Sequence, residues 1–294
     1  MIAARTAVDG LASGAVIALM GLGVVIVYRS TRVLSFAQGA LASLGAYLFF
    51  QFQVLWGWPV VVAFPAAIAA GALAGAGAER IAVNPLRHSD ALTRTVSTLA
   101  LVLAAQVLMR AVWGGSERFL PPLTSAGVSI GGERIGGQTV AILVATVVVA
   151  AALAWWFRST LTGLSLAAMA DEPASARLLG VSPDRVSLLT WGLASGLGAL
   201  AGILATPLLV LNPWQMTFIM VSGYAAALVG GFASLPLTLA GGLGIGVVRA
   251  LITSEVNVAG LSETIGFIAV FAVLIATRGR DQLADLLAGE RTAL

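Results

Sequence analysis

The feature that most constrains this chain is a succession of nearly uncharged apolar segments, each long enough to cross a lipid bilayer. About 20 apolar residues span a hydrocarbon core about 30 Å thick. Hydrophobic residues make up 59% of the 294-residue chain and charged residues 10%. The segments also lack the polar faces that a soluble helix or strand presents to water. We therefore expect an all-α polytopic membrane protein.

Loop signals divide the chain into about nine predicted transmembrane helices, and eight to ten remain compatible with the pattern. The predicted spans are 8–28, 33–53, 58–78, 95–113, 138–157, 186–211, 216–233, 236–253 and 262–277. One helical bundle accounts for residues 1–294, which we treat as a single transmembrane domain. Two long connections, 114–137 and 158–185, and a tail at 278–294 lie outside the predicted spans.

The positions of the arginines orient the predicted bundle. All 16 basic residues are arginine, and 11 of them lie in alternate loops or in the tail: Arg29, Arg32, Arg80, Arg87, Arg94, Arg158, Arg177, Arg185, Arg278, Arg280 and Arg291. Cytoplasmic loops of membrane proteins are enriched in such residues. We expect a multi-pass protein of the bacterial plasma membrane, with the N-terminus outside and the C-terminus in the cytoplasm. The basic isoelectric point reflects these loops rather than a nucleic-acid partner.

Composition argues against several other function classes. Without lysine the chain cannot form a phosphate-binding P-loop, so any ATP must be hydrolysed on another chain. With no cysteine and one histidine, His88, we expect no metal site and no cofactor, and no catalytic constellation can be assembled. The predicted mid-span positions carry no charge, whereas a proton- or sodium-coupled carrier usually needs a buried carboxylate.

Polar and small residues within otherwise apolar spans are candidates for a solute route. They are Ser35, Gln38, Gly39, Ser97, Gln106, Ser195 and Asn212. Each polar one could equally form a hydrogen bond between helices, worth about 0.6–2 kcal/mol. Gln38 is the strongest candidate, because it lies beside Gly39 at an interruption and its amide can both donate and accept hydrogen bonds.

A short internal repeat suggests how the spans are related. The sequence Gly-Leu-Ala-Ser-Gly occurs at 10–14 and again at 192–196, each time early in a predicted span. In the predicted topology the first copy runs inward and the second outward. This arrangement is typical of an inverted repeat, and the glycine-rich interruptions that follow predict broken helices near its interface.

The two long connections carry further signals. In 158–185, helical spacing predicts a short helix over Leu166–Leu179 that ends at Gly180, and Ser182 and Pro183 begin the next span. A helix between two spans offers a docking surface for a soluble partner. In 114–137, the apolar spacing around Gly131 predicts a small hairpin on the outer face.

Three ordered groups of residues resemble the LivH-type permeases of branched-chain amino acid ABC importers. They are the opening at 10–47, including Leu34-Ser-Phe-Ala-Gln-Gly39; the segment from Thr162 through Arg185; and Gly230-Gly-Phe-Ala-Ser-Leu-Pro236 with Gly241-Gly242. The family usually has Asn-Phe-Ala-His-Gly where this chain has Ser35-Phe-Ala-Gln-Gly39. The resemblance covers nearly the whole chain in the same order.

This resemblance implies a non-enzymatic permease subunit. Its partners would be a homologous LivM-like permease, two cytosolic ATPases, an external solute-binding protein and membrane lipid. The family's ATPase-coupling segment matches Asp171, Glu172, Ala176, Arg177, Leu178, Leu179 and Gly180. Branched-chain amino acids are the first expected substrates; related systems carry urea, short amides or small carboxylates. A self-sufficient channel or secondary carrier remains the alternative class.

Overall fold

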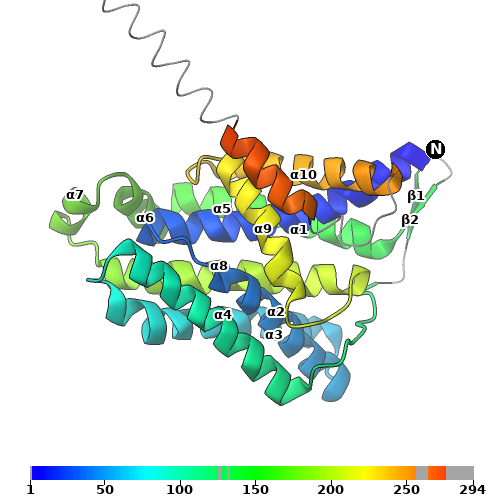
Figure 1. Cartoon of the computed structure of the whole chain (residues 1–294), viewed down its shortest axis with the longest axis horizontal. Coiled ribbons are helices and arrows are strands. Elements are labelled where there is room, and N and C mark those ends of the chain that lie inside the picture. The colour runs from blue at the N-terminus through cyan, green and yellow to red at the C-terminus, as the bar shows by residue number, and fades with distance from the viewer. Residues whose placement is uncertain (1, 125–126, 131–132, 256–263, 276–294) are drawn as a thin grey trace, which may run out of the picture.

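The computed structural model describes residues 2–124, 127–130, 133–255 and 264–275, and these form a helical bundle with one small hairpin (Figure 1). Its α-helices are α1 (Ile2–Thr31), α2 (Ala37–Phe50), α3 (Val60–Ala78), α4 (Ala91–Trp113), α5 (Gly137–Ser159), α6 (Leu161–Asp171), α7 (Pro173–Leu178), α8 (Pro183–Ala205), α9 (Gln215–Val229), α10 (Leu235–Glu255) and a helix at Thr264–Ile275. Short π- or 3₁₀-turns follow three of them, at Gln51–Leu55, Glu79–Leu86 and Thr206–Leu208.

Six helical stretches are long and apolar enough to cross a membrane. They are Thr6–Thr31, Val60–Leu86, Leu92–Trp113, Gly137–Ser159, Pro183–Leu208 and Leu235–Glu255. The prediction of an all-helical polytopic membrane protein is therefore confirmed. Helices also occupy the other three predicted spans, as α2, α9 and Thr264–Ile275, but α9 and Thr264–Ile275 are shorter apolar helices.

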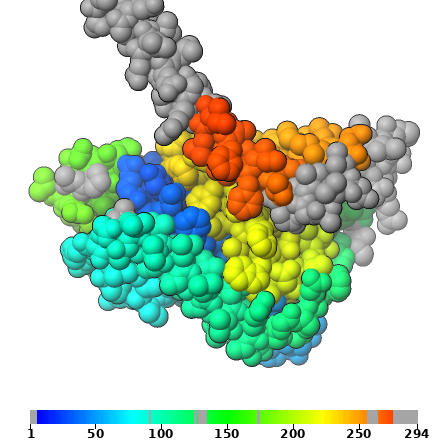
Figure 2. Space-filling view, viewed as in Figure 1, coloured from blue at the N-terminus to red at the C-terminus, as the bar shows by residue number. Residues whose placement is uncertain are grey.

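Two helices, α1 and α8, form the centre of the bundle. In their apolar stretches 89% and 83% of the residues are buried, against 17–22% in the other four long stretches. Helix α1 packs mainly on α10 and also on α9, whereas α8 packs mainly on α3 and also on α2. The helix Thr264–Ile275 lies over α9, where Gly266 faces Ser222 (Figure 2). Most of the residues in the apolar stretches of α3, α4, α5 and α10 therefore face away from the rest of the chain.

Glycines allow the central helices to approach closely. A Cβ atom at Gly246 of α10 would collide with the backbone of Gly14 in α1, and one at Gly75 of α3 would collide with Ser195 in α8. In a bilayer, small residues of this kind let backbones meet and gain van der Waals contact. The repeated pentapeptide lies on both central helices, so its glycines serve helix packing.

Two predicted boundaries are wrong. The single helix expected over Leu166–Leu179 is divided into α6 and α7 at Glu172, because Pro173 has no N–H for the helical ladder and disfavours helical backbone at the residue before it. The span expected to end at residue 78 continues as helical turns to Leu86. Glu79, which was expected to lie outside the membrane span, therefore lies inside this helical stretch. Only 1% of its surface is exposed.

The two ends of the bundle are formed by different elements. The predicted hairpin is confirmed as β1 (Val128–Ile130) and β2 (Glu133–Ile135), antiparallel with Ser129 opposite Arg134. The hairpin and the N-terminus lie at one end of the bundle, and α6 and α7 lie at the other (Figure 1). The predicted tail at 278–294 lies outside the described residues.

Candidate functional site

Gln38 lies in α2 where this helix packs between α1 and α8. Its side chain is 1% exposed, and neither Nε2 nor Oε1 has a hydrogen-bond partner among the described residues. A Cβ atom at Gly23 of α1 would lie 3.1 Å from Nε2, a tight contact, whereas one at Gly198 of α8 would lie at an ordinary 3.6 Å, so glycine at position 23 gives the amide room. A buried polar group without a partner costs about 1–3 kcal/mol, and such groups in native proteins call for an explanation.

Among the described residues, other buried polar atoms without partners occur just before and on α2, on α8 and on α9, and α2 packs against both α8 and α9. We call the set the polar seam, and its members are Ser35, Gln38, Ser43, Tyr47, Trp191, Ser195 and Tyr224. Four of these, Ser43, Tyr47, Trp191 and Ser195, are completely buried. The bundle therefore holds a set of buried hydroxyl, amide and indole groups that the described residues leave without partners.

The predicted route residue Gly39 marks the tightest contact between α2 and α9. Its N–H donates to the sulfur of Met220 at 2.8 Å, and a Cβ atom here would collide with the backbone of Thr217. From α4, Gln106 Nε2 donates to Thr217 Oγ1 at 3.2 Å, while Gln106 Oε1 has no partner. Gly39 and Gln106 thus meet at the same residue of α9.

The remaining two predicted route residues form local backbone bonds. Ser97 Oγ donates to the carbonyl of Arg94 one turn earlier in α4, at 2.7 Å. Asn212 Oδ1 accepts from the N–H groups of Trp214 and Gln215 at 3.0 and 2.9 Å, where it organises the turn before α9. Neither side chain joins the polar seam.

Sequence reasoning missed four members of the seam: Ser43, Tyr47, Trp191 and Tyr224. An isolated aromatic or serine inside an apolar run is typical of helix packing, and composition gives no sign that its polar atom lacks a partner. The one available signal was Tyr47, which ends the motif Leu44-Gly-Ala-Tyr47 within the opening segment that resembles a known family.

The segment predicted to contact a soluble partner projects from the bundle as α6 and α7 (Figure 1). Ala176 is buried against the bundle, with 1% of its surface exposed, whereas Leu178 and Leu179 are 89% and 83% exposed. Asp171 and Glu172 are also exposed, and Gly180 ends the segment with φ of +85°, a conformation that favours glycine. The two leucines form an apolar projection that the isolated chain leaves uncovered.

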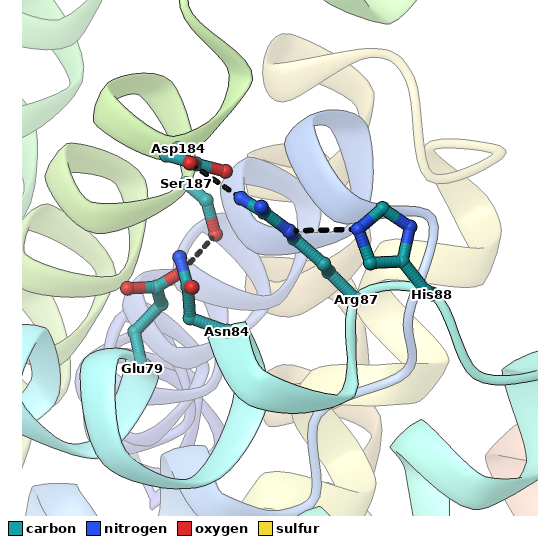
Figure 3. A network of polar contacts seen from close by, with 6 residues as sticks. All are labelled: Glu79, Asn84, Arg87, His88, Asp184 and Ser187. Atoms are coloured by element: carbon teal, nitrogen blue, oxygen red, sulfur yellow. Dashed lines mark hydrogen bonds and ion pairs between the residues drawn. The ribbon is translucent and has the colours of Figure 1, made fainter.

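Beside α7 lies a cavity of about 600 Å³, which we call the arginine-end cavity. Its walls come from the end of α1, the turns from Glu79 to His88, the start of α4, α7 and the start of α8. Figure 3 shows the polar contacts along one wall. Arg87 Nη1 and Asp184 Oδ2 form an ion pair at 2.5 Å, and this hydrogen bond raises the pKa of Arg87.

The inner part of that wall carries Glu79. Ser187 Oγ donates to Glu79 Oε1 at 2.8 Å, and Asn84 Nδ2 approaches the same oxygen at 3.5 Å. Oε2 is buried and has no partner. His88 lies at the exposed side, where its Nε2 accepts from Arg87 Nε at 3.2 Å.

The family model described as the branched-chain amino acid transport system permease component matches residues 6–277. This chain belongs to that family. The permease is therefore a transport subunit of a branched-chain amino acid ABC transport system and not itself an enzyme. The sequence-based resemblance to this family is confirmed.

Curated relatives extend over most of the permease. It is 27% identical over 281 residues, 91% of each chain, to the high-affinity branched-chain amino acid transport system permease protein LivH of Escherichia coli K12. It is 26% identical over 257 residues to the corresponding protein BraD of Pseudomonas aeruginosa, covering 83% of the permease and 84% of BraD. A probable LivH permease of Methanocaldococcus jannaschii is 26% identical over 245 residues, 80% of the permease and 76% of the relative.

Proposed function

We propose that the permease imports leucine, isoleucine and valine from an external binding protein into the cytoplasm. It does so paired with a homologous permease and driven by two cytosolic ATPases. The observation that carries this proposal is the polar seam, a set of buried polar atoms without partners among the described residues of a membrane bundle. Family membership supplies the substrate class and the energy source.

The route follows the polar seam along α2. Ser35, Gln38 and Ser195 offer hydroxyl and amide groups that can bind the polar end of an amino acid, and Gly39 sets the spacing between α2 and α9. Separation of these helices would expose groups that the closed bundle leaves unsatisfied, so their desolvation favours opening toward a polar solute. Gln106 reaches the same region from α4.

The ATPases dock on α6 and α7. Support comes from the exposed Leu178 and Leu179 beside a buried Ala176, which ties the projection to the bundle. The side chains predicted to contact the ATPase are Asp171, Glu172, Ala176, Arg177, Leu178, Leu179 and Gly180. With the ATPases docked there, α7 would lie in the cytoplasm, and the hairpin and N-terminus would lie on the outer side.

The bundle is built as an inverted repeat with nine crossings. The packing supports this: α1 contacts α10 and α9, and α8 contacts α3 and α2, so exchanging α1 with α8, α2 with α9 and α3 with α10 reproduces the same neighbours. Helices α2 and α9, which are shorter or interrupted by polar residues, occupy equivalent places in the two halves. Substrate routes in inverted-repeat transporters lie at such an interface.

Reconstitution of the complete system in liposomes tests the proposal. With the binding protein outside and ATP inside, labelled leucine should accumulate, and omission of the ATPases should abolish uptake. Uptake of leucine by the permease alone without ATP would replace this mechanism by a channel or secondary carrier. ATP-driven uptake of urea or a short amide, with none of leucine, isoleucine or valine, would retain the ABC mechanism and overturn the substrate.

A further inference from the structure

The arginine-end cavity contains opposite charges that are not matched to each other. Three arginines on its walls, Arg32, Arg94 and Arg177, have no carboxylate partner among the described residues. Arg32 donates instead to the carbonyl of Ala170, and Arg94 Nη1 approaches the carbonyl of Thr31 at 3.4 Å. Arg94 Nε is buried and has no acceptor in the part of the chain that the structure describes.

The same cavity contains a carboxylate without a cation. Glu79 is 1% exposed, its Oε2 has no partner, and its Oε1 interacts only with the neutral groups of Ser187 and Asn84. Buried carboxylates are normally paired with a positive charge, because desolvating a lone charge is costly. Asp184, the other acidic side chain on the walls, is already paired with Arg87. Figure 3 shows the two arrangements side by side.

We propose that the arginine-end cavity binds a free α-amino acid, whose carboxylate lies on Arg94 and Arg32 and whose ammonium group lies on Glu79. A zwitterion supplies both missing charges at once, whereas an anion would leave Glu79 without a cation and an amine would leave the arginines without an anion. Arginine is well suited to bind a carboxylate. The cavity, at about 600 Å³, is within the usual range for small-molecule sites.

The cavity adjoins α7, so an amino acid bound there would touch the segment on which the ATPases are proposed to dock. Arg177 of α7 is one of the wall residues. The identity of the amino acid as leucine, isoleucine or valine rests on the proposed function. The transported amino acid would bind this site last, before its release into the cytoplasm. Occupancy of the site would follow the concentration of the amino acid in the cytoplasm.

Equilibrium binding to the assembled transporter in lipid nanodiscs, without the external binding protein, tests the site. Three probes share the isobutyl side chain of leucine: L-leucine, 4-methylpentanoate, which lacks the ammonium group, and 3-methylbutylamine, which lacks the carboxylate. Leucine should bind at least ten-fold more tightly than either of the others. Equal binding of leucine and 4-methylpentanoate would indicate a simple anion site and overturn the proposal, as would the absence of leucine binding.

Variants locate the binding. Glu79→Gln should reduce leucine affinity to that of 4-methylpentanoate, Glu79→Asp should keep the preference for leucine, and Arg94→Gln should abolish binding of both. Arg80→Gln and Glu117→Gln remove exposed charges outside the cavity and should change nothing. Leucine binding that persists unchanged in both Glu79→Gln and Arg94→Gln places the ligand elsewhere and overturns the proposal.

ATP-driven uptake measured on the same preparations separates this inference from the proposed function. Leucine uptake without leucine binding in the cavity overturns only the inference. If ATP-driven uptake is specific for another solute, the proposed substrate is wrong, and the cavity is then tested with that solute and its analogues.

Discussion

Single buried side chains in this permease are placed at an energetic disadvantage, and Gln38 is the clearest case. Its amide is enclosed by α1 and α8 and forms no hydrogen bond. A residue selected only for packing at this position would be apolar, because an apolar side chain of similar shape removes the desolvation penalty. This amide is consistent with the proposed contact between Gln38 and a polar solute in another state of the bundle.

Replacement of Gln38 by leucine separates these two roles. We expect Gln38→Leu to leave the melting temperature unchanged or raise it, while leucine uptake falls at least ten-fold. Gln51→Leu is the matched control, because Gln51 Oε1 accepts from Trp113 Nε1 at 2.8 Å. Loss of that bond should destabilise the fold by about 1 kcal/mol and preserve uptake. Normal uptake by Gln38→Leu would remove this residue from the route.

Two glycines of α10 provide a test of the packing with its own control. A Cβ atom at Gly246 meets the backbone of Gly14, whereas one at Gly244 meets nothing within 4 Å. We expect Gly246→Ala to destabilise the bundle by about 1–3 kcal/mol through overpacking. Gly244→Ala should be neutral or stabilising by up to about 1 kcal/mol, since alanine favours helix. Thermal unfolding in detergent measures both, and equal effects would contradict the close contact.

At the scale of the element, α7 is a short helix that exposes its apolar side chains. Leu178 and Leu179 protrude beyond the buried Ala176. We expect Leu178→Asp combined with Leu179→Asp to reduce ATPase binding at least ten-fold without changing the melting temperature of the permease, because both side chains are exposed. Leu178→Met keeps an apolar side chain and should bind normally. Full ATPase binding by the double variant, measured by co-purification, would place the docking surface elsewhere.

The existence of a helix was predictable from sequence where the length of the apolar segment alone decides it, as in α3, α4 and α5. The residues at which some of the helices end were not predictable in this way. Pro173 divides a segment that helical spacing predicted to be one helix. The helical turns from Glu79 to Leu86 extend another predicted span past a charged residue. Hydropathy ends a helix at Glu79 because it counts the charge but has no information on the hydroxyl of Ser187 that approaches from α8.

The candidate site was predictable to a similar extent. Gln38 and Gly39 stood out as polar and small residues in an apolar span, and the structure places them between the central helices. Asn212 had the same sequence signature but organises a turn. The distinction depends on which backbone groups lie nearby in space, and a pattern along one chain carries no such information.

For the whole molecule, the arrangement of the two ends in the membrane is open to direct measurement. The permease sequence contains no cysteine, so any labelling of the chain by a maleimide comes from the introduced thiol. We expect Ser116→Cys, in the loop that precedes the hairpin, to react with a membrane-impermeant maleimide applied to intact cells. Ser175→Cys in α7 should react only after the membrane is opened. Both positions are exposed, and the reverse pattern would invert the proposed topology.

The packing of α1 against α10 has a consequence for how the permease is made. Helix α1 leaves the ribosome well before α10, its main packing partner, is synthesised. Synthesis of the stretch from Thr31 to Leu235 takes roughly 10–40 s at about 5–20 residues per second. Throughout that interval the glycine face of α1 must be covered by lipid, by the insertion machinery or by a chaperone. Nascent chains that stop before Leu235 present this face permanently, which marks them for quality control.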